Sequence, residues 1–287
     1  MADDTAAART GLDTTVSHSA RIWNYWLGGK DNFAVDREAG DRVAAVLPII
    51  VAQARADRAF LGRAVRYLAG PEGIRQFLDI GTGLPTADNT HQVAQRTAPE
   101  ARIVYVDNDP LVLSHARALL TSSPEGVCDY IDADLREPEK ILTGAARTLD
   151  FTRPVALLLL GVLHHISDTG QAQEIVRRLT AALVPGSFLA INHSTSAVSG
   201  AAMEDAVAHW NQVGTPPMTL RSPQQITRFF DGLDLLEPGV VSCSRWRPDI
   251  SPLGGQPPEV DEFCGVARKP EHAPRGALLY GPSNPKT

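Results

Sequence analysis

Glycine and carboxylate residues follow the apolar runs of this 287-residue sequence at positions where they could hold a ligand that carries a sugar. FLDIGTGLPT has the pattern of a buried strand that continues into Asp79, Gly81 and Gly83 and then into a helix. Glycines at such a turn let the backbone approach a ligand closely at the carboxyl end of a strand. RIVYVD places Asp107 24 residues beyond Gly83, where its carboxylate can accept hydrogen bonds from both hydroxyls of a ribose. These residues predict a site for an adenosine-type molecule.

Two more predicted strand ends carry residues of the same kind. YIDADLRE places Asp134 and Leu135 after the third strand, where Asp134 can accept the exocyclic amine of an adenine and Leu135 can cover its face. GVLHHISD follows the fourth strand, and Gly161 in it permits another close approach. The two histidines of this segment, His164 and His165, are candidate general bases. A sheet with a purely structural role would not require such residues at four consecutive strand ends.

Most of these residues also have a structural interpretation that the sequence leaves open. Asp79 is as consistent with hydrogen bonds that hold the glycine turn as with ligand contact, and Asp134 is as consistent with a helix cap. A histidine at a strand end is more often a satisfied structural residue than a base. Asp107 is different, because Asp109 is the better N-cap for the helix that follows.

Alternating elements must position these residues. From residue 76 onward, short apolar runs alternate with helical stretches, which predicts βαβ units and a parallel sheet. The apolar runs are QFLDI, RIVYVD, VCDYID, VALLLL and SFLAIN. Upstream, apolar residues recur at helical spacing between 49 and 69. Downstream, we expect helices near 200–213 and 223–231 and strands near 235–247 and 262–268.

The strand-end motifs together resemble those of class I S-adenosylmethionine-dependent methyltransferases. More narrowly, the segments ARIWNYWLGGKDNFAVDRE, ADRAFLGRAVRYLA and QFLDIGTGLPT are similar to a bacterial family described as S-adenosyl methyltransferase-like, formerly a domain of unknown function. The resemblance covers about residues 17–268. It implies an α/β fold with a Rossmann-like, doubly wound, seven-stranded sheet, an N-terminal helical cap and S-adenosyl-L-methionine as the cofactor. It implies no particular methyl acceptor.

The aromatic opening segment has two interpretations. In a class I methyltransferase a segment before the first strand commonly covers the cofactor, and here Gly28-Gly29 would be a hinge that lets Tyr25 and Lys30 contact the bound molecule. Alternatively, Trp23 and Trp26 lie three residues apart on a helix and staple a permanently docked segment to the core.

The predicted site therefore combines the strand ends with the opening segment. The predicted cofactor contacts are Tyr25, Lys30, Asp79, Gly81, Gly83, Asp107, Asn108, Asp134, Leu135 and Gly161. The predicted catalytic residues are His164 and His165, and we predict no metal site because no His, Cys or Asp grouping has ligand spacing. We expect a disordered N-terminus (1–16), a helical cap or lid (17–72), a methyltransferase domain (73–268) and an irregular tail (269–287).

Composition favours a cytoplasmic protein with a small-molecule partner. The net charge is −6 and no Lys/Arg run is present, which argues against a nucleic-acid partner. VALLLLGVL is far shorter than the about 20 residues that cross a bilayer, so no membrane association is expected. The N-terminus lacks the basic and apolar regions of a secretory signal, and three scattered cysteines indicate no disulfide framework. Oligomeric state is not predicted.

Three functions fit these observations to different degrees. The first is a methyltransferase that acts on a small-molecule acceptor. The second is a non-catalytic sensor of S-adenosylmethionine or its demethylated product, which would need no second pocket. The third is an NAD(P)-dependent oxidoreductase, which is disfavoured because Thr86 stands where the fingerprint has its third glycine and because we expect the helix to open with Leu84-Pro85.

Overall fold

The structure is a computed structural model that describes residues 14–85, 88–119, 122–249 and 255–271. Most of the N-terminus for which we predict disorder (1–16) and of the irregular tail (269–287) lies outside these residues, as does Thr86.

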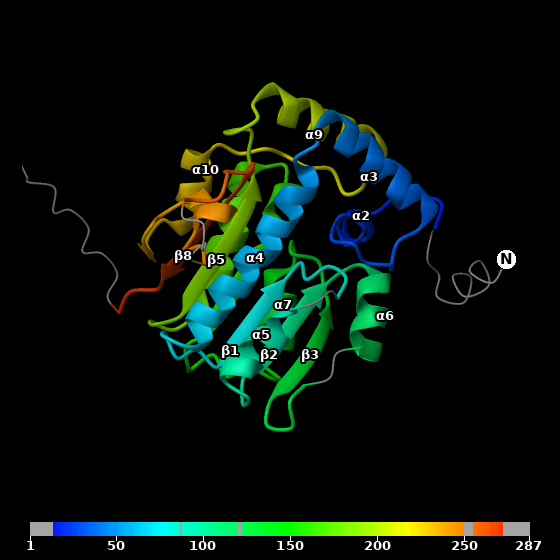
Figure 1. The fold of residues 1–287 in the computed structure, drawn as a ribbon. Coiled ribbons are helices and arrows are strands. Elements are labelled where there is room, and N and C mark those ends of the chain that lie inside the picture. The colour runs from blue at the N-terminus through cyan, green and yellow to red at the C-terminus, as the bar shows by residue number, and fades with distance from the viewer. Residues whose placement is uncertain (1–13, 86–87, 120–121, 250–254, 272–287) are drawn as a thin grey trace, which may run out of the picture.

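A single mixed sheet forms the centre of the described chain (Figure 1). Its strands are β1 (Gln76–Ile80), β2 (Arg102–Asp107), β3 (Val127–Asp132), β4 (Ala156–Leu160), β5 (Phe188–Ser194), β6 (Asp234–Leu235), β7 (Val241–Ser242) and β8 (Glu262–Arg268). They lie in the order β3-β2-β1-β4-β5-β8-β6, with β7 also paired to β8. The first five strands are parallel to one another, and β8 is antiparallel to β5, β6 and β7.

The sheet confirms the predicted doubly wound α/β class, with eight strands instead of seven. β6 pairs with Ala267 and Arg268, whereas β7 pairs with Phe263 and Cys264. Both lie on the edge of β8 that β5 leaves free, so these two short strands share the seventh position of the sheet. The five parallel strands coincide with the five apolar runs of the sequence to within two residues.

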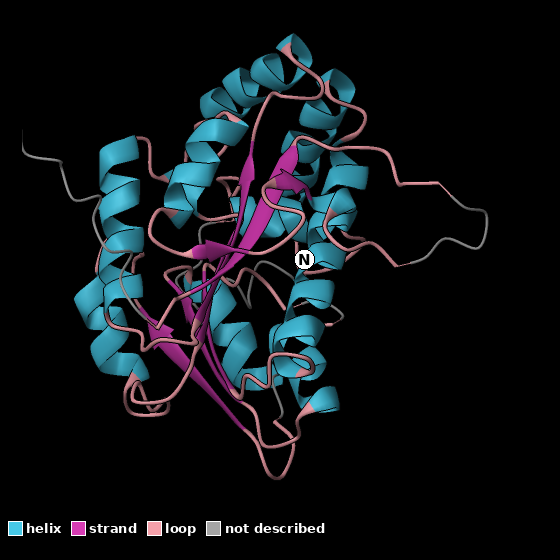
Figure 2. Cartoon of the chain, turned by 90° about the vertical axis from the view of Figure 1, so that its left-hand side faces the viewer, coloured by secondary structure: helices cyan, strands magenta, loops and turns pink. Residues whose placement is uncertain are grey.

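Helices cover both faces of the sheet and its carboxyl edge (Figure 2). The helices are α2 (Ser19–Trp26), α3 (Ala34–Val46), α4 (Ile50–Ala69), α5 (Thr90–Thr97), α6 (Pro110–Leu119), α7 (Pro138–Ala145), α8 (Thr169–Ala181), α9 (Ala201–Val213) and α10 (Pro223–Thr227), with short 3-10 helices η1 (Leu163–His165), η2 (Arg228–Phe230) and η3 (Cys243–Arg245). α4 and α5 pack on one face of the sheet, and α7 and α8 on the other. Phe77 and Leu78 show why, because successive strand residues point to opposite faces and join different cores.

The turn after β1 differs from our prediction. We expected a helix to open at Leu84-Pro85, but α5 begins at Thr90. The helix start lies at Asn89, whose backbone N–H donates to the Gln92 side chain three residues later (2.9 Å). Asn89 and Gln92 are the two residues of a capping box at the start of α5. This pair favours a helix N-terminus more strongly than Leu84-Pro85 does, so the helix begins at Thr90.

The N-terminal helices and α9 form the cap that was predicted above the sheet (Figure 1). Their buried apolar side chains make one cluster, which joins Ile22, Trp26 and Val43 to Met203 and Trp210. α4 connects this cap to the sheet, because its first turns belong to the cap cluster and its later turns to the sheet core.

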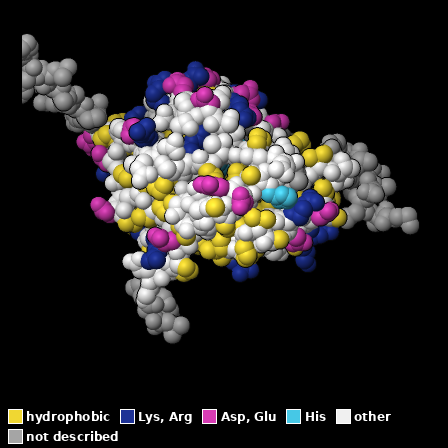
Figure 3. Space-filling view, turned by 90° about the horizontal axis from the view of Figure 1, so that it is seen from above, with side chains coloured by type: hydrophobic (Ala, Val, Ile, Leu, Met, Phe, Trp, Pro, Cys, Tyr) yellow, Lys and Arg dark blue, Asp and Glu magenta, His cyan; other side chains and the backbone are white. Residues whose placement is uncertain are grey.

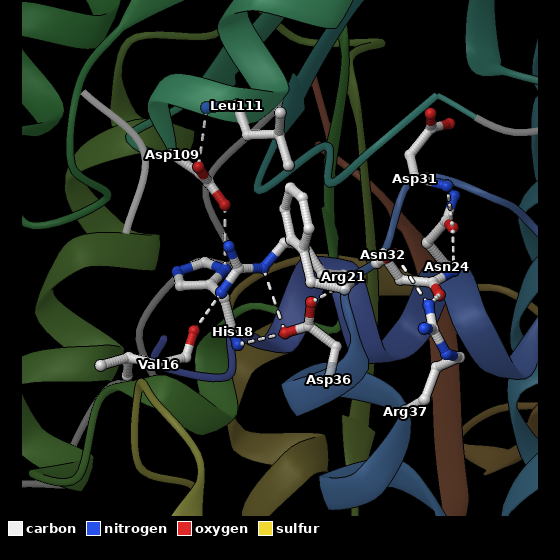
Figure 4. Close-up of polar contacts among 11 residues, drawn as sticks. Val16, His18, Arg21, Asn24, Asp31, Asn32, Asp36, Arg37, Asp109 and Leu111 are labelled. Carbon is white, nitrogen blue, oxygen red and sulfur yellow. Dashed lines mark hydrogen bonds and ion pairs between the residues drawn. The ribbon is translucent and has the colours of Figure 1, made fainter. Parts of the chain in front are cut away.

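Buried polar contacts fix α2 against α3 and against the loop after β2 (Figure 4). Asp36 is fully buried and accepts from His18 N–H (3.0 Å), Arg21 Nε–H (3.1 Å) and Phe33 N–H (2.8 Å). His18 Nδ1 also lies 2.9 Å from Asp109 Oδ2. The beginning of the cap is thereby tied to the strand end that carries Asp107.

Candidate functional site

A cavity of about 240 Å³ lies between the carboxyl ends of the parallel strands and the cap. A single water molecule needs a cavity of only about 10–15 Å³, so this one can hold a much larger ligand. Its lining has three parts. The strand-end region consists of Asp79, Gly81, Gly83, Asp107, Asn108, Asp134, Leu135 and Gly161. The polar junction consists of Gln53, Asp57, His164 and Ser194. The cap chamber consists of Trp23, Trp26, Val43, Leu47, Ile50, Met203, Ala206, Val207, Trp210 and Met218.

The structure brings ten of the twelve predicted site residues together around this cavity. They are the eight residues of the strand-end region together with His164 and His165. The two that it does not bring there are Tyr25 and Lys30. Tyr25 Oη donates to Asp41 Oδ1 (2.8 Å), and Lys30 is exposed. This geometry does not support the contacts that we predicted for Tyr25 and Lys30.

The glycine turn after β1 has the conformation that the sequence pattern requires. Gly81 (φ +78°) and Gly83 (φ +65°) both have left-handed backbones, which other residues adopt only at a cost. A Cβ at Gly81 would lie 2.5 Å from Val162 Cγ2, so this glycine allows the β1 and β4 ends to approach. A Cβ at Gly83 would meet no atom within 4 Å and would project into free space at a position that lines the cavity.

Asp79 lies at the end of β1, before this turn, and its carboxylate contacts α5. Its Oδ2 accepts from Thr90 Oγ1–H at 2.6 Å. Burial raises the pKa of Asp79 to about 6, against the opposing effects of this hydrogen bond and of the Arg58 charge. Asp79 therefore joins the turn to α5 and faces the cavity at the same time.

Asp107 supports the turn from the neighbouring strand. Its Oδ2 accepts from Gly83 N–H and its Oδ1 from Asp109 N–H, both at 2.9 Å. Asp109 caps α6 by accepting from Leu111 N–H (2.8 Å), which confirms that Asp107 is not needed as the cap. Each carboxylate oxygen has two acceptor positions, so both oxygens of Asp107 keep one for a ligand hydroxyl.

The next strand end is linked to this one by side chains. Asn108 Nδ2–H donates to Asp134 Oδ2 (3.0 Å), and the Asp134 carboxylate also forms an ion pair with Arg136 (3.1 Å). Leu135 is buried beside Asp134 and lines the same cavity. A polar and an apolar side chain thus lie side by side here, as recognition of a flat base requires.

The two predicted histidines occupy different surroundings. His164 is buried, and its Nδ1 lies 3.3 Å from Ser194 Oγ, which in turn donates to Glu262 Oε2 (2.7 Å). His165 is half-buried, and its Nδ1–H donates to the carbonyl oxygen of Pro217 (2.9 Å). Burial lowers the pKa of His164 well below its usual range and that of His165 to about 4, so both rings are neutral at pH 7.

Three residues of α4 line the cavity that the sequence reasoning missed: Gln53, Asp57 and Arg58. Asp57 accepts hydrogen bonds from the side chains of Asn192 and Trp23, and burial raises its pKa to about 6. Arg58 Nη2–H donates to Asn89 Oδ1 (2.9 Å). The available signal was a charged pair beside the apolar stripe of a helix that we placed in the predicted cap (17–72) without predicting any ligand contact for it.

Asn192 extends this arrangement to the fourth strand end. Its Oδ1 accepts from the backbone N–H of Gly161 while its Nδ2–H donates to Asp57 Oδ1. One amide side chain therefore fixes the distance between α4 and the end of β4.

The glycine pair of the opening segment ends a helix. Gly28 (φ +82°) follows α2, its N–H donates to Tyr25 O (2.9 Å), and the N–H of Gly29 donates to Asn24 O (2.8 Å). This is a left-handed helix terminus of the kind that glycine favours. A Cβ at Gly29 would overlap the buried side chain of Asn24, so close packing also requires glycine there.

The tryptophans adopt the arrangement of the stapled interpretation. The rings of Trp23 and Trp26 pack edge to face with their centroids 5.5 Å apart. Trp26 is buried and its Nε1–H lies 3.3 Å from the carbonyl oxygen of Gly40. Trp23 is half-buried and lines the cavity, so one ring anchors the segment and the other faces the site.

The face of the molecule on the side of the cap carries charges of both signs. Seen from the side of the cap, Lys and Arg side chains are interspersed with Asp and Glu (Figure 3). Among the described residues, no cluster of three or more His, Cys, Asp or Glu side chains has the arrangement of a metal site. No helix in the described ranges combines the length and apolarity of a membrane span.

Comparison with known proteins agrees with this architecture. A family model described as S-adenosyl methyltransferase matches residues 5–270. The crystal structure of a DUF574 family protein from Streptomyces avermitilis MA-4680 is similar, with 44% sequence identity, a TM-score of 0.86 and coverage of 90% of this chain and 99% of that chain. A provisionally assigned methyltransferase from Thermobifida fusca YX has 40% identity, a TM-score of 0.82 and coverage of 91% and 97%, respectively. No curated protein sequence matches. This chain belongs to the S-adenosyl methyltransferase family.

Proposed function

We propose that this protein binds S-adenosyl-L-methionine in the strand-end region and transfers its methyl group to a small molecule held in the cap chamber. The observation that carries the proposal is one cavity that joins these two regions across the polar junction. A methyltransferase must hold a donor and an acceptor at the same time, and the two regions offer different chemistry for them.

The strand-end residues fit the donor. Gly83 leaves space into which a side chain would otherwise project, and Asp107 keeps a free acceptor position on each oxygen for a ribose. Asp134 and Leu135 offer a polar and an apolar partner for an adenine. Arg58 and Asp57 of α4 line the same cavity and offer opposite charges to the amino-acid end of such a molecule.

The protein's own contribution to the reaction is alignment and exclusion of water. S-adenosylmethionine, when bound, supplies an activated methyl group on a sulfonium, which a nucleophile attacks in line. Trp23 and the cap close the cavity above the polar junction, and His164 lies beside it as a neutral base. Placing the two reactants correctly is therefore the main task of the site.

The cap chamber favours an enzyme over a sensor. A protein that only senses the donor has no need of a second space, whereas here ten apolar residues from separate segments surround one. An oxidoreductase is the weaker alternative, because α5 begins at Thr90 and so does not present its N-terminus directly after Gly83.

Calorimetric titration tests the proposed function. We expect S-adenosylmethionine and S-adenosylhomocysteine to bind with micromolar affinity, that is about −8 kcal/mol, and NAD not to bind measurably. Binding of NAD with no response to either sulfur compound would refute the proposal.

A further inference from the structure

The walls of the cap chamber exclude one class of acceptor. All ten residues that define it are apolar or aromatic, and the polar α2 residues that also line the cavity, His18, Ser19 and Asn24, carry no permanent charge. Among the described residues that line the cavity, only Arg58 and Arg136 are permanently cationic; Arg58 is proposed to meet the donor, and Arg136 pairs with Asp134. A carboxylate or phosphate in the chamber would lose its hydration without gaining a cation.

One face of α4 runs along the cavity and contacts the cap chamber first and the polar junction next. Ile50, Gln53, Asp57 and Leu61 lie at helical spacing on this face. Ile50 belongs to the cap cluster and Leu61 to the sheet core. Gln53 therefore lies about 5 Å along the helix from the chamber wall and about 6 Å from Asp57. A molecule in the chamber meets the polar junction at Gln53.

Gln53 brings an unsatisfied acceptor to this point. Its side chain is 1% exposed, and its Nε2–H donates to Glu262 Oε2 (3.2 Å). Its Oε1 has no hydrogen-bond partner among the described residues. A buried carbonyl oxygen without a partner is costly, so a ligand that donates a hydrogen bond would be bound selectively.

His164 offers a second acceptor through a chain of hydrogen bonds. Ser194 Oγ–H donates to Glu262 Oε2 (2.7 Å), which leaves the Ser194 oxygen to accept from His164 (3.3 Å) in the ring tautomer that has its proton on Nδ1. With the proton on Nδ1, the other ring nitrogen, Nε2, is an acceptor. The junction thus presents two acceptors, Gln53 Oε1 and His164 Nε2.

We propose that the acceptor is a neutral, largely apolar small molecule whose single O–H or N–H nucleophile is held by Gln53 Oε1 and His164 Nε2. This inference rests on the proposed function and specifies its substrate class. In the reaction the acceptor's O or N forms a bond to the methyl carbon, and the electron pair of the broken C–S bond remains on sulfur. The proton leaves the acceptor for His164 Nε2.

Three probes with the same ring system test this inference by calorimetry. The protein is saturated with S-adenosylhomocysteine and titrated with 2-naphthol, naphthalene and 2-naphthoate. We expect 2-naphthol to bind about tenfold more tightly than either of the others, since naphthalene lacks the donor and 2-naphthoate is an anion. Equal or tighter binding of 2-naphthoate, or no binding of any probe, overturns the proposal.

A variant assigns the preference to Gln53. Gln53→Leu should reduce the advantage of 2-naphthol over naphthalene to about threefold or less while leaving S-adenosylhomocysteine affinity within about twofold. Gln212→Leu is the matched control, because Gln212 is exposed on α9, and it should change neither quantity. If folded Gln53→Leu still prefers 2-naphthol over naphthalene as strongly as the wild type does, Gln53 is not the residue responsible. The three titrations of the wild-type protein test the acceptor class independently of this variant.

Failure of the proposed function has a different result. If S-adenosylhomocysteine does not bind, the donor assignment is wrong. The same three titrations, carried out without it, then still test which probe the cap chamber prefers. If it binds and 2-naphthol has no advantage, only the acceptor class is wrong.

Discussion

The two ends of the cavity are built in different ways. The strand-end region is made of backbone turns and of short polar side chains one or two residues from the end of a strand. The cap chamber is made of apolar side chains from α2, α3, α4 and α9 and from Leu47 and Met218 in the adjoining segments, so that residues of the N-terminal helices meet residues from a distant part of the sequence. A turn restricts its residue types, whereas a chamber wall needs only apolar volume. The first end can therefore be identified from local sequence and the second cannot.

The two regions also differ in what holds them in place. The strands that lead to the strand-end region are held by the ladder of the sheet, which fixes their backbones up to the last paired residue. The cap is held by side chains, above all by the buried pair of Arg21 and Asp36 (Figure 4). Changes to single side chains should consequently affect the position of the cap more than that of the sheet.

The largest effect should come from Asp36. Asp36→Ala leaves Arg21 buried without its carboxylate and removes the partner of two backbone N–H groups, so we expect a loss of about 3–5 kcal/mol in the free energy of unfolding. Glu38→Ala is the matched control on the same helix, because its ion pair with Arg42 is exposed, and it should cost under about 1 kcal/mol. Chemical denaturation measures both. Equal costs would show that the cap does not depend on its buried ion pair.

The next effect concerns donor affinity. Asp107→Ala removes the carboxylate proposed to accept the ribose hydroxyls, which should weaken S-adenosylhomocysteine binding by about 1.5–3 kcal/mol, or roughly ten- to a hundredfold. Asp132→Ala is the control, because Asp132 is the exposed partner of Asp107 in the adjoining strand. Calorimetry on folded variants should show a loss only for Asp107→Ala. Unchanged affinity would remove Asp107 from the donor site.

A smaller effect concerns Asp57, which lies where the two regions meet. Burial raises its pKa from an unfolded value of 3.8 to about 6 in the folded protein. The folded state therefore binds the proton more tightly, so the resulting stabilisation is complete below pH 3.8 and is lost as the pH rises through about 6. Asp57→Asn has no such proton to lose.

Stability curves of the two proteins measure this effect. Between pH 4.5 and 7.5, the free energy of unfolding of the wild-type protein should fall by about 1–2 kcal/mol more than that of Asp57→Asn. This is less than the full pKa shift implies, because water in the cavity screens the charge. At pH 7.5 the variant should also bind S-adenosylhomocysteine more weakly. Parallel stability curves would mean that Asp57 has an ordinary pKa and is not a carboxylate kept for function.

The smallest effect should be seen in the opening segment. Four residues of α2 are buried: Arg21, Ile22, Asn24 and Trp26. Gly28 ends this helix with a left-handed backbone. These contacts favour a fixed wall over the lid that we considered from the sequence. We therefore expect the amides of residues 20–38 to be protected from hydrogen exchange both with and without saturating S-adenosylhomocysteine. A large gain in protection on binding would restore the lid interpretation.

The sequence predicted the sheet and its strand ends because both depend on local patterns. Apolar runs of five or six residues located the parallel strands, and the glycine pair located the turn, where both glycines have left-handed backbones. Ten of the predicted site residues line the cavity, and their roles stay predictions. The start of α5 was misjudged, because Asn89 and Gln92 form a stronger helix start than Leu84-Pro85.

The rest of the site depends on tertiary packing. Gln53 and Asp57 lie on a helix whose apolar stripe predicts its buried face but not which of the polar residues beside that stripe line a cavity. Tyr25 and Trp23 are neighbours in an aromatic segment, yet the helix turns the first toward Asp41 and the second toward the site. Residue type alone cannot distinguish them, since the difference is the direction of a side chain on a docked helix.

A structure of the protein in complex with S-adenosylhomocysteine would test the central claim most directly. We expect both ribose hydroxyls to lie within hydrogen-bond distance of Asp107, roughly 2.6–3.2 Å, and the sulfur to point toward Gln53 and His164. The cap chamber would remain open beside it for the acceptor. A ligand seated in the cap chamber, or bound outside the cavity with Asp107 making only its present contacts to Gly83 and Asp109, would contradict the account.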